Sequence, residues 1–548
     1  MTIIHIAHAT NIDLIDHISV LWKSLTLNNP DHQFALHLLH SIVDSSAVDK
    51  FKVDFEAVYP RVGLSTHYVD VSGMVYSNNF KHGTMATILR CVIPTVLSDI
   101  KKILYLDIDV LITGDLEPIW RLDCGETGLC LKSSIHPDWR MRDGYRCGNT
   151  GVMLMDLERL RSNGFVEKVL ESNSQKSEEA QTLINRYAEG RYSDLAGNMN
   201  IFMCQDDAVY EDPIVYNIVG PKKPWNSSES DIQCDLWRSY RDIVISKKLQ
   251  VTRGIGIGVL CYTTTNLGDW TQSAAALYVW WVYFDRPGTF REFIETCIAT
   301  SKMGAYPITW INRDRISLAT KPEGVDRVVI LCNGWWMHTY KRLYNFIPPD
   351  WIRPIYISLH IAAPVLLTSS VCDYLRGYEP IGCRDSATVK LLMDRGVKAY
   401  FSGCLTMTLN LRDPKIGFTP HSRYKDKTVY LDYKCPPATR AVKLTQRIKT
   451  TDNSNLILTM QRCLDLLVAK QVYTVRLHVW LPLICNKAHI KLMNSSAGRE
   501  FEKGDRDNHA KKTDRFTGLF ETISTKSTLT CFKALLLNRT LYQIEKSM

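Results

Sequence analysis

The most restrictive feature of this sequence is an apolar run, residues 103–112, that contains two carboxylates, Asp107 and Asp109. Short unbroken runs of Ile, Leu, Val and Tyr are typical of strands buried in a parallel sheet. An unpaired charge in such a strand costs too much free energy, so both carboxylates must meet something positive at its end. On a regular strand they share a face and can reach one divalent cation. The run therefore predicts a metal site at the carboxyl end of a parallel strand; the alternative is a strand that stops at Asp107, with Asp109 capping a turn.

Length and composition limit the class of protein. At 548 residues the chain predicts two to three domains. A net charge of +9 is mild for this length and gives no strong case for nucleic acid, whereas anionic ligands such as phosphates fit well. The 16 cysteines lie scattered in apolar runs, which is typical of reduced thiols rather than of disulfides or a zinc site. Without a signal peptide or an apolar stretch of about 18 residues, the chain is expected to be cytoplasmic.

Around the two carboxylates the pattern predicts alternating strands and helices. Strands are expected at residues 3–7 and 34–40, with an amphipathic helix at 16–27 between them. A helix at 84–97 carries Arg90 among apolar residues, which favours a functional side chain over a solvated one. A second buried strand at 149–157 begins with Asn149, which either contacts a ligand or forms an ordinary turn before the strand.

The motifs that follow the carboxylates carry a resemblance to a known family. They are Thr113-Gly114-Asp115-Leu116-Glu117-Pro118, Cys147-Gly148-Asn149-Thr150-Gly151 and Gly220-Pro221-Lys222-Lys223-Pro224-Trp225. In this order they resemble glycosyltransferase family 8, retaining enzymes of the GT-A fold that use a nucleotide sugar and manganese. The resemblance covers residues 1 to about 240.

The resemblance implies a role for individual residues. Mn²⁺ or Mg²⁺ would be held by Asp107, Asp109 and Asn217, the last at the position of a family histidine. Gln181 would lie near the anomeric carbon and position the sugar. The contacts to the donor would come from Asn11, Arg90, Asp107, Asn149, Gly220 and Lys223.

Some positions depart from the family pattern. Ala9 and Thr10 replace an acidic pair, Ala180 and Thr182 replace the acids beside Gln181, and Asn217 replaces the metal-binding histidine. An amide oxygen binds manganese less strongly than imidazole does. The acidic pair at residues 206–207 is interpreted as a solvent loop.

The second half begins a new alternation of strands and helices. A strand is expected at 254–262, then a turn and a helix that starts after Asp269, which is a phosphate-binding arrangement in general form. Further strand and turn signals lie at residues 328–336, 379–388, 399–406 and 472–482. Together these segments resemble the polysaccharide pyruvyl transferase family over residues 254–520, which implies two Rossmann-like halves similar to GT-B enzymes.

This second resemblance implies a site for phosphoenolpyruvate. Its phosphate or carboxylate would be bound by Arg384 and Arg476, together with Asn266 and Asp269 of the first turn. His478 would be the general acid, with Arg476 beside it as a catalytic residue. The alternative is that residues 476–478 only cap a strand.

The sequence therefore predicts an α/β protein with a GT-A domain at residues 1–250, a GT-B-like domain at 254–520 and a C-terminal helix or tail at 521–548. The tail has helical spacing at 516–544, typical of a closing helix or a contact with an anionic surface. The residues before it, up to 513, are expected to be loose.

The predicted function is assembly of surface polysaccharide on the cytoplasmic side, with at most peripheral contact to the membrane. The first domain would move a hexose, with UDP as the expected carrier, to a glycan or lipid-linked glycan with retention; the second would add pyruvate from phosphoenolpyruvate. The alternatives are that only one domain is active, the first being the weaker because of Ala9, Ala180 and Asn217, or that both halves are glycan-binding scaffolds.

Overall fold

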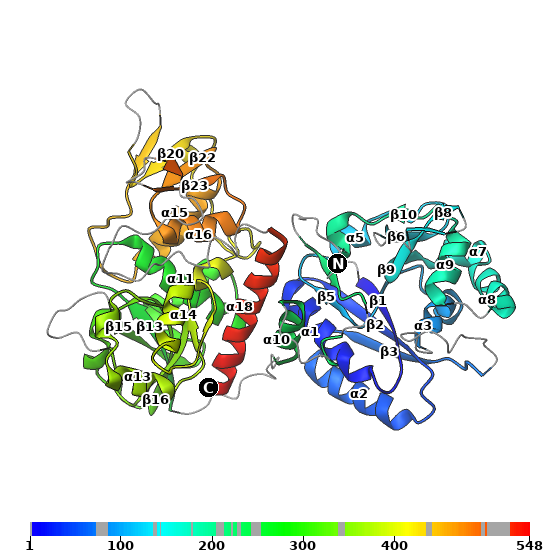
Figure 1. The fold of residues 1–548 in the computed structure, drawn as a ribbon, viewed down its shortest axis with the longest axis horizontal. Helices are drawn as coiled ribbons and strands as arrows, with labels where there is room; N and C mark the ends of the chain where they lie inside the picture. Colours follow the sequence, from blue (N-terminus) through cyan, green and yellow to red (C-terminus); the bar gives the residue numbers. More distant parts are fainter. Residues whose placement is uncertain are drawn as a thin grey trace. The chain divides into compact units, whose positions relative to one another are not determined.

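The chain divides into two compact units, residues 1–248 and 249–548, which we describe separately (Figure 1). The computed structural model describes residues 3–72, 86–134, 140–142, 144–176, 179–203, 213–220, 223–226, 232–242, 254–337, 346–434, 441–494, 499–500 and 526–548. Both units are of the α/β class, as predicted, and parallel strands dominate their sheets.

The first unit is built on a seven-stranded sheet in the order β10-β6-β9-β4-β1-β2-β3, in which β9 runs antiparallel to both of its neighbours. The strands are β1 (Ile3–Thr10), β2 (Gln33–His40), β3 (Gly63–Tyr68), β4 (Lys102–Leu106), β6 (Leu129–Ser133), β9 (Gly148–Asp156) and β10 (Ser193–Asp194). The helices around it include α1 (Ile18–Asn28), α2 (Ser45–Val58), α7 (Leu157–Ser162), α8 (Phe165–Lys176), α9 (Ala180–Ala188) and α10 (Ile232–Asp242).

Both faces of this sheet are covered, which explains the apolar run in β4. Leu104 and Leu106 belong to the hydrophobic core under α1 and α2, whereas Ile103 and Tyr105 belong to the core under α7, α8 and α9. Successive side chains of a strand point to opposite faces, so a strand in this position must be apolar at every residue. The predicted strands 3–7, 34–40 and 149–157 and the helix 16–27 are also found, shifted by a few residues.

Two predicted elements are broken in the structure. The run 103–112 is not one strand: β4 ends at Leu106, and β5 (Val110–Ile112) leaves the main sheet to pair antiparallel with β12 (Val215–Asn217). The helix expected at 84–97 is three short turns over residues 86–96, with a 3₁₀ turn at Arg90–Val92. Its first two residues and the acidic pair at 206–207 lie outside the described residues.

The sheet of the first unit also buries histidines. His8 on β1 is fully buried: its Nδ1 donates to the Leu106 carbonyl at 2.7 Å, and its Nε2 accepts from the Trp22 indole at 3.0 Å. His5, His37 and His67 stack across β1, β2 and β3, joined by ring nitrogen contacts of 3.0 and 3.4 Å. Burial lowers the pKa of His8 and of His37 to about 4.

We expect the first unit to lose stability in mild acid. Because the folded pKa of His8 lies below its ordinary value of 6.5, the folded protein binds fewer protons than the unfolded chain, and stability falls as the pH drops from 6.5 towards 4. His8 alone should remove about 2 kcal/mol between pH 7 and pH 5. Calorimetry at the two pH values should show this loss reduced in His8→Gln and unchanged when the exposed His489 of the second unit is replaced by Gln.

The second unit has two sheets, one of seven strands in the order β14-β15-β13-β16-β17-β18-β19 and one of five in the order β21-β20-β22-β23-β24. Among the described strands of this unit, only the edge strands β14 and β24 are antiparallel to their neighbours. The strands of the larger sheet are β13 (Ile255–Cys261), β14 (Lys302–Met303), β15 (Tyr306–Asn312), β16 (Arg327–Trp336), β17 (Ile352–Ile361), β18 (Ile381–Cys383) and β19 (Ala399–Phe401). Those of the smaller sheet are β20 (Thr428–Leu431), β21 (Val442–Leu444), β22 (Gln471–Thr474), β23 (Ile490–Asn494) and β24 (Arg499–Glu500).

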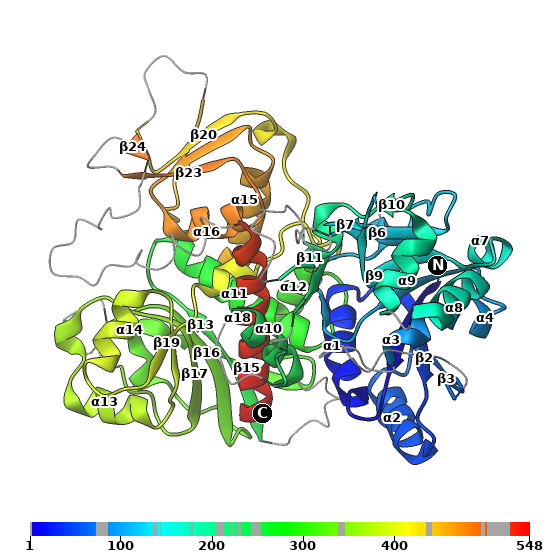
Figure 2. The same ribbon diagram turned by 45° about the vertical axis from the view of Figure 1, so that its right-hand side comes forward.

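One buried helix, α11 (Leu267–Tyr283), joins the two halves of the second unit (Figure 2). It packs against β13 and β16 of the larger sheet and against α15 (Asn455–Leu467) and α16 (Leu477–Cys485) beside the smaller one. It begins two residues before Asp269 rather than after it, because the side chain of Asn266 caps it by accepting from the Gly268 N–H. The remaining helices include α12 (Phe290–Thr300), α13 (Ser369–Arg376) and α14 (Ser386–Met393).

The chain ends in a long helix, α18 (Lys526–Ser547), which packs on the second unit (Figures 1 and 2). Phe532 stacks on Phe401, and the Tyr283 hydroxyl donates to Glu545 at 2.8 Å. Among the described residues no helix is long and apolar enough to cross a membrane. The cysteines whose side chains are described are free, and all but Cys261 are buried.

Candidate active site

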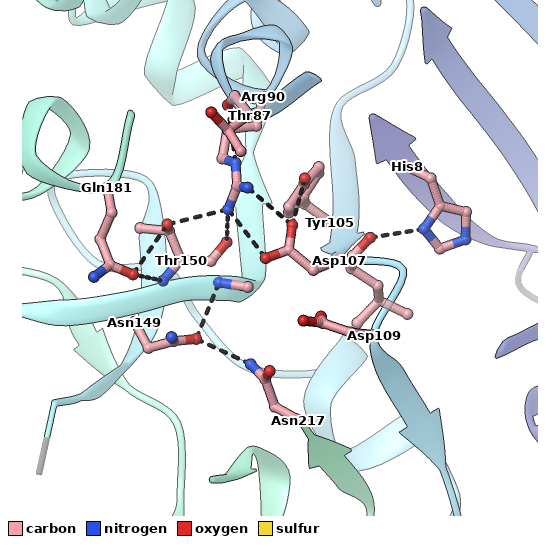
Figure 3. A network of polar contacts seen from close by, with 12 residues as sticks. His8, Thr87, Arg90, Tyr105, Asp107, Asp109, Asn149, Thr150, Gln181 and Asn217 are labelled. Carbon is pink, nitrogen blue, oxygen red and sulfur yellow. Dashed lines mark hydrogen bonds and ion pairs between the residues drawn. The ribbon is translucent and has the colours of Figure 1, made fainter. Parts of the chain in front are cut away.

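The predicted site residues of the first unit cluster just after the end of β4. Among them, the Asp107 side chain is held in place by its neighbours (Figure 3). One carboxylate oxygen accepts from the Tyr105 hydroxyl at 2.7 Å and forms an ion pair with Arg90 at 2.9 Å. Arg90 is buried and also donates to the Thr150 carbonyl at 2.8 Å. Burial alone would lower the pKa of Arg90, but the negative charge of Asp107 raises it, so the guanidinium stays charged. Arg90 thus serves as the fixed counter-ion of Asp107.

Asp109 is paired with a different cation. Its Oδ2 lies 2.5 Å from the Lys223 ammonium, which also donates to the Ile218 carbonyl at 2.6 Å. The Ile218 N–H in turn donates to the Asp109 carbonyl at 3.0 Å, which fixes this turn against the end of β12. The other carboxylate oxygen, Oδ1, is buried and accepts no hydrogen bond from any described residue. Burial raises the pKa of Asp109, and Lys223 opposes that rise.

The side chains of Asn217 and Asn149 lie next to Gly151, close to the Asp107 carboxylate. Asn217 Nδ2 donates to Asn149 Oδ1 at 3.1 Å, and that oxygen also accepts from the Gly151 N–H at 3.0 Å. A Cβ on Gly151 would lie 2.7 Å from Asn217 Nδ2 and 2.9 Å from Asp107 Oδ2. The three strand ends therefore converge on a point where any residue larger than glycine would displace these side chains.

Gln181 reaches the same network from α9. Its Oε1 accepts from the Thr150 N–H at 3.1 Å, and Thr150 contacts Arg90 (Figure 3). Asn11, at the end of β1, has a buried side-chain oxygen that accepts no hydrogen bond from the described part of the chain. Gly220 has a φ of +93°, which suits glycine, and a Cβ there would meet nothing within 4 Å.

These residues fit a hard divalent cation. Asp107, Asp109 and Asn217 supply only oxygen or amide groups, the kind of ligand that Mg²⁺ and Mn²⁺ accept. The orphaned, buried Asp109 Oδ1 is the observation that favours a cation, since a carboxylate oxygen without a partner is costly. The Asn217 amide nitrogen is engaged by Asn149, which leaves its oxygen as the atom for a cation.

A second group, formed by His32, Asp115 and Glu117, lies close enough together to hold an ion. Asp115 Oδ1 accepts from the Glu117 N–H at 2.9 Å and from His32 Nε2 at 2.8 Å; Asp115 is exposed, and Glu117 and His32 are half-buried. Ordinary local hydrogen bonds account for this surface group.

In the second unit, polar side chains collect at the carboxyl ends of the larger sheet. Arg384, after β18, donates through Nη1 to His478 Nε2 at 3.3 Å, and His478 lies in the first turn of α16. Gln272 of α11 contacts His478 Nδ1 at 3.2 Å and donates to Asp269 at 3.3 Å. Arg384 is buried, and its Nε lies 3.8 Å from Asp385 Oδ2 as an ion pair, whereas Nε and Nη2 donate no hydrogen bond to a described residue. Such a guanidinium is prepared for an anion.

Two of the predicted residues lie outside this cluster. Arg476 pairs with Asp432 at 2.7 Å and is partly exposed, and the Asn266 side chain is used in capping α11. Asp269 is held by the Thr264 hydroxyl at 2.6 Å and by the buried Arg313 at 3.4 Å. The structure thus groups Arg384, His478 and Asp269 but not Arg476 or Asn266.

Several partners in both clusters were missed from the sequence. Tyr105 and Thr150 sit inside strand patterns, where a hydroxyl gives no signal of its own. Gln272 lies one turn after Asp269 on the same helix, so helical spacing could have indicated it. Arg313 follows β15, and nothing in its neighbourhood marks it.

Comparison with known proteins identifies the first unit. Residues 5–229 match the model of the family described as glycosyl transferase family 8. The first unit carries a glycosyltransferase family 8 domain. The matched range contains Arg90, Asp107, Asp109, Asn217 and Lys223, and it lies wholly before the second unit. The prediction of a family 8 domain is confirmed; the pyruvyl transferase resemblance of the second unit stays a prediction.

The relatives of the family 8 domain are distant. General stress protein A of Bacillus subtilis is 23% identical over 256 residues, which cover 41% of this chain and 88% of that protein. Glycosyltransferase GlyE of Streptococcus pneumoniae is 26% identical over 185 residues, 30% of this chain and 44% of that protein. A crystal structure of the galactosyltransferase LgtC with donor and acceptor sugar analogues is 19% identical, with a TM-score of 0.38, over 44% of this chain and 95% of that one.

Proposed function

We propose that the first unit transfers a hexose from a nucleotide sugar, with UDP as the expected carrier, to a glycan or lipid-linked glycan acceptor with retention. The observation that carries this proposal is the position of Asp107, Asp109, Asn217 and Lys223 around one strand end within a family 8 domain. Parallel α/β sheets bind their ligands at this end of the strands.

The chemistry divides between the cation and the chain. A divalent cation held by Asp107, Asp109 and Asn217 would stabilise the negative charge of the departing diphosphate. Lys223 adds a point charge next to the same position. Gln181, held by Thr150, positions the sugar rather than attacking it, since an amide is a poor nucleophile. In retention the acceptor hydroxyl approaches from the face that the diphosphate leaves.

Release of nucleoside diphosphate from a panel of nucleotide sugars tests this proposal. With a glycan acceptor and Mn²⁺, one donor should be consumed far faster than the others, and chelation by EDTA should reduce the rate by about a hundredfold or more. Restoring Mn²⁺ should restore the rate. A folded protein that consumes no donor under any metal condition would favour the glycan-binding scaffold instead.

The second unit supports a second candidate function, transfer of pyruvate from phosphoenolpyruvate to a sugar. The observation that favours it is Arg384, a buried guanidinium beside His478 whose Nη2 donates no hydrogen bond to a described residue and whose Nε contacts only Asp385, at ion-pair distance. Arg384 would bind the phosphate or carboxylate, and His478 would supply the proton as the sugar hydroxyls add and phosphate leaves. Two active units would place both reactions in the assembly of one surface polysaccharide.

Binding of phosphoenolpyruvate tests this second candidate. At a concentration a hundredfold above its Kd, it should stabilise the second unit by about 2.7 kcal/mol, seen as a rise in its melting temperature. Arg384→Gln should lose this rise, whereas Arg395→Gln, at an exposed position, should keep it. Inorganic phosphate producing the same rise as phosphoenolpyruvate would point to a simple anion site instead.

A further inference from the structure

The ion pairs at the end of β4 differ in how firmly their cations are held. The side chain of Arg90 is 7% exposed and is fixed by the carbonyls of Thr87 and Thr150 as well as by Asp107. That of Lys223 is 23% exposed, and among the described residues its ammonium contacts only Asp109 and the Ile218 carbonyl. A lysine on a flexible four-carbon stem can move its charge by several ångströms, whereas a guanidinium fixed at three points cannot.

The charges of these four side chains cancel without any further ion. Asp107 and Asp109 supply two negative charges, and Arg90 and Lys223 supply two positive ones. A divalent cation that bound Asp109 beside the ammonium would meet a like charge at short range in a partly buried site. A cation on the free Oδ1 and the ammonium on Oδ2 would share one carboxylate, so each weakens the binding of the other although they contact different oxygens.

We propose that Lys223 is an exchangeable counter-ion, which occupies Asp109 in the resting protein and moves to the diphosphate when cation and nucleotide bind. This inference rests on the proposed function of the first unit. It adds that the binding of cation and nucleotide is accompanied by a move of Lys223 from one partner to another. Each ligand then assists the other: the cation displaces the ammonium, and the diphosphate gives the displaced ammonium a new partner. The cation alone binds weakly, and the cation with nucleoside diphosphate binds tightly.

Direct binding of Mn²⁺ tests the exchange without reference to catalysis. Free Mn²⁺ can be followed by its electron paramagnetic resonance signal during titration of the full chain, with and without saturating UDP. In the wild type we expect UDP to tighten Mn²⁺ binding by about 10- to 100-fold. In Lys223→Met the competing ammonium is gone, so Mn²⁺ alone should bind about 10-fold tighter than to the wild type, and UDP should add less.

Two control variants separate the possible results. Lys101→Met removes an exposed lysine at the other end of the β4 region and should match the wild type. Asp109→Asn should weaken Mn²⁺ binding with or without UDP. If Lys223→Met binds Mn²⁺ alone no tighter than the wild type, or keeps the full effect of UDP, the exchange is wrong while the metal-dependent transferase stands. If neither protein binds Mn²⁺ even with UDP, the exchange and the metal dependence both fail, and donor consumption in EDTA would decide whether the transferase survives.

Discussion

Asp109→Asn should lower the rate of glycosyl transfer by about a thousandfold while leaving the protein folded. The substitution keeps the size of the side chain but removes the charge that pairs with Lys223 and that, in the proposed site, holds the cation. Removal of one electrostatic group at a reacting centre typically costs a factor of 10² to 10³. Burial raises the pKa of Asp109, so its carboxylate is costly to the fold, and the partly exposed Lys223 can turn its ammonium to solvent when the carboxylate is gone. A neutral amide should therefore change the melting temperature little.

The measurement is the initial rate of nucleoside diphosphate release with the preferred donor, acceptor and Mn²⁺. Asp115→Asn is a matched control, since it makes the same chemical change six residues away at an exposed carboxylate. It should retain the wild-type rate. An Asp109→Asn enzyme within tenfold of the wild type would show that this carboxylate does not hold the cation.

Arg90→Met should destabilise the first unit by about 3 to 5 kcal/mol, the usual cost of removing one partner of a buried ion pair. The Asp107 carboxylate would keep the Tyr105 hydroxyl but lose its counter-ion, and Thr150 would lose a donor. For a unit of this size the melting temperature should fall by about 10 °C. Differential scanning calorimetry of the full chain measures this change.

A second substitution distinguishes loss of charge from loss of packing. Adding Asp107→Asn to Arg90→Met removes the unpaired carboxylate, so the double variant should recover a large part of the lost stability. Arg121→Met, which breaks an exposed pair with Glu117, should cost less than 1 kcal/mol. A double variant no more stable than Arg90→Met would mean that Arg90 acts through packing alone.

The central strands β1, β2, β4 and β9 of the first unit could be predicted because both faces of the sheet are buried there, so the sequence pattern is a continuous apolar run. The break after Leu106 appeared only as the alternative, a strand that stops at Asp107, because it depends on pairing between Val110 and Asn217, more than a hundred residues apart. The same limit applies to the cluster of polar side chains around Asp107 and Asp109. Asp107 and Lys223 stand in recognisable motifs, whereas the Tyr105 hydroxyl and the Thr150 carbonyl become partners only when β4 and β9 lie side by side.

In the second unit the sequence located the strand ends better than the side chains that meet there. Arg384 and His478 come together because β18 and the start of α16 face each other, and both had been singled out. Arg476 is an arginine like Arg384 and stands two residues before His478, so the sequence predicts that it binds the same anion. Its extended backbone at the cap of α16 instead places the guanidinium within reach of Asp432.

Gly151 leaves no room for a single added carbon atom. A methyl group there would enter the space of Asn217 and Asp107, although it would change no charge and leave β9 with an acceptable strand residue. We expect Gly151→Ala to push these side chains aside without changing any charge, and so to lower transfer by the first unit while the protein stays folded. Any reaction that such a variant still performs can then be assigned to the second unit.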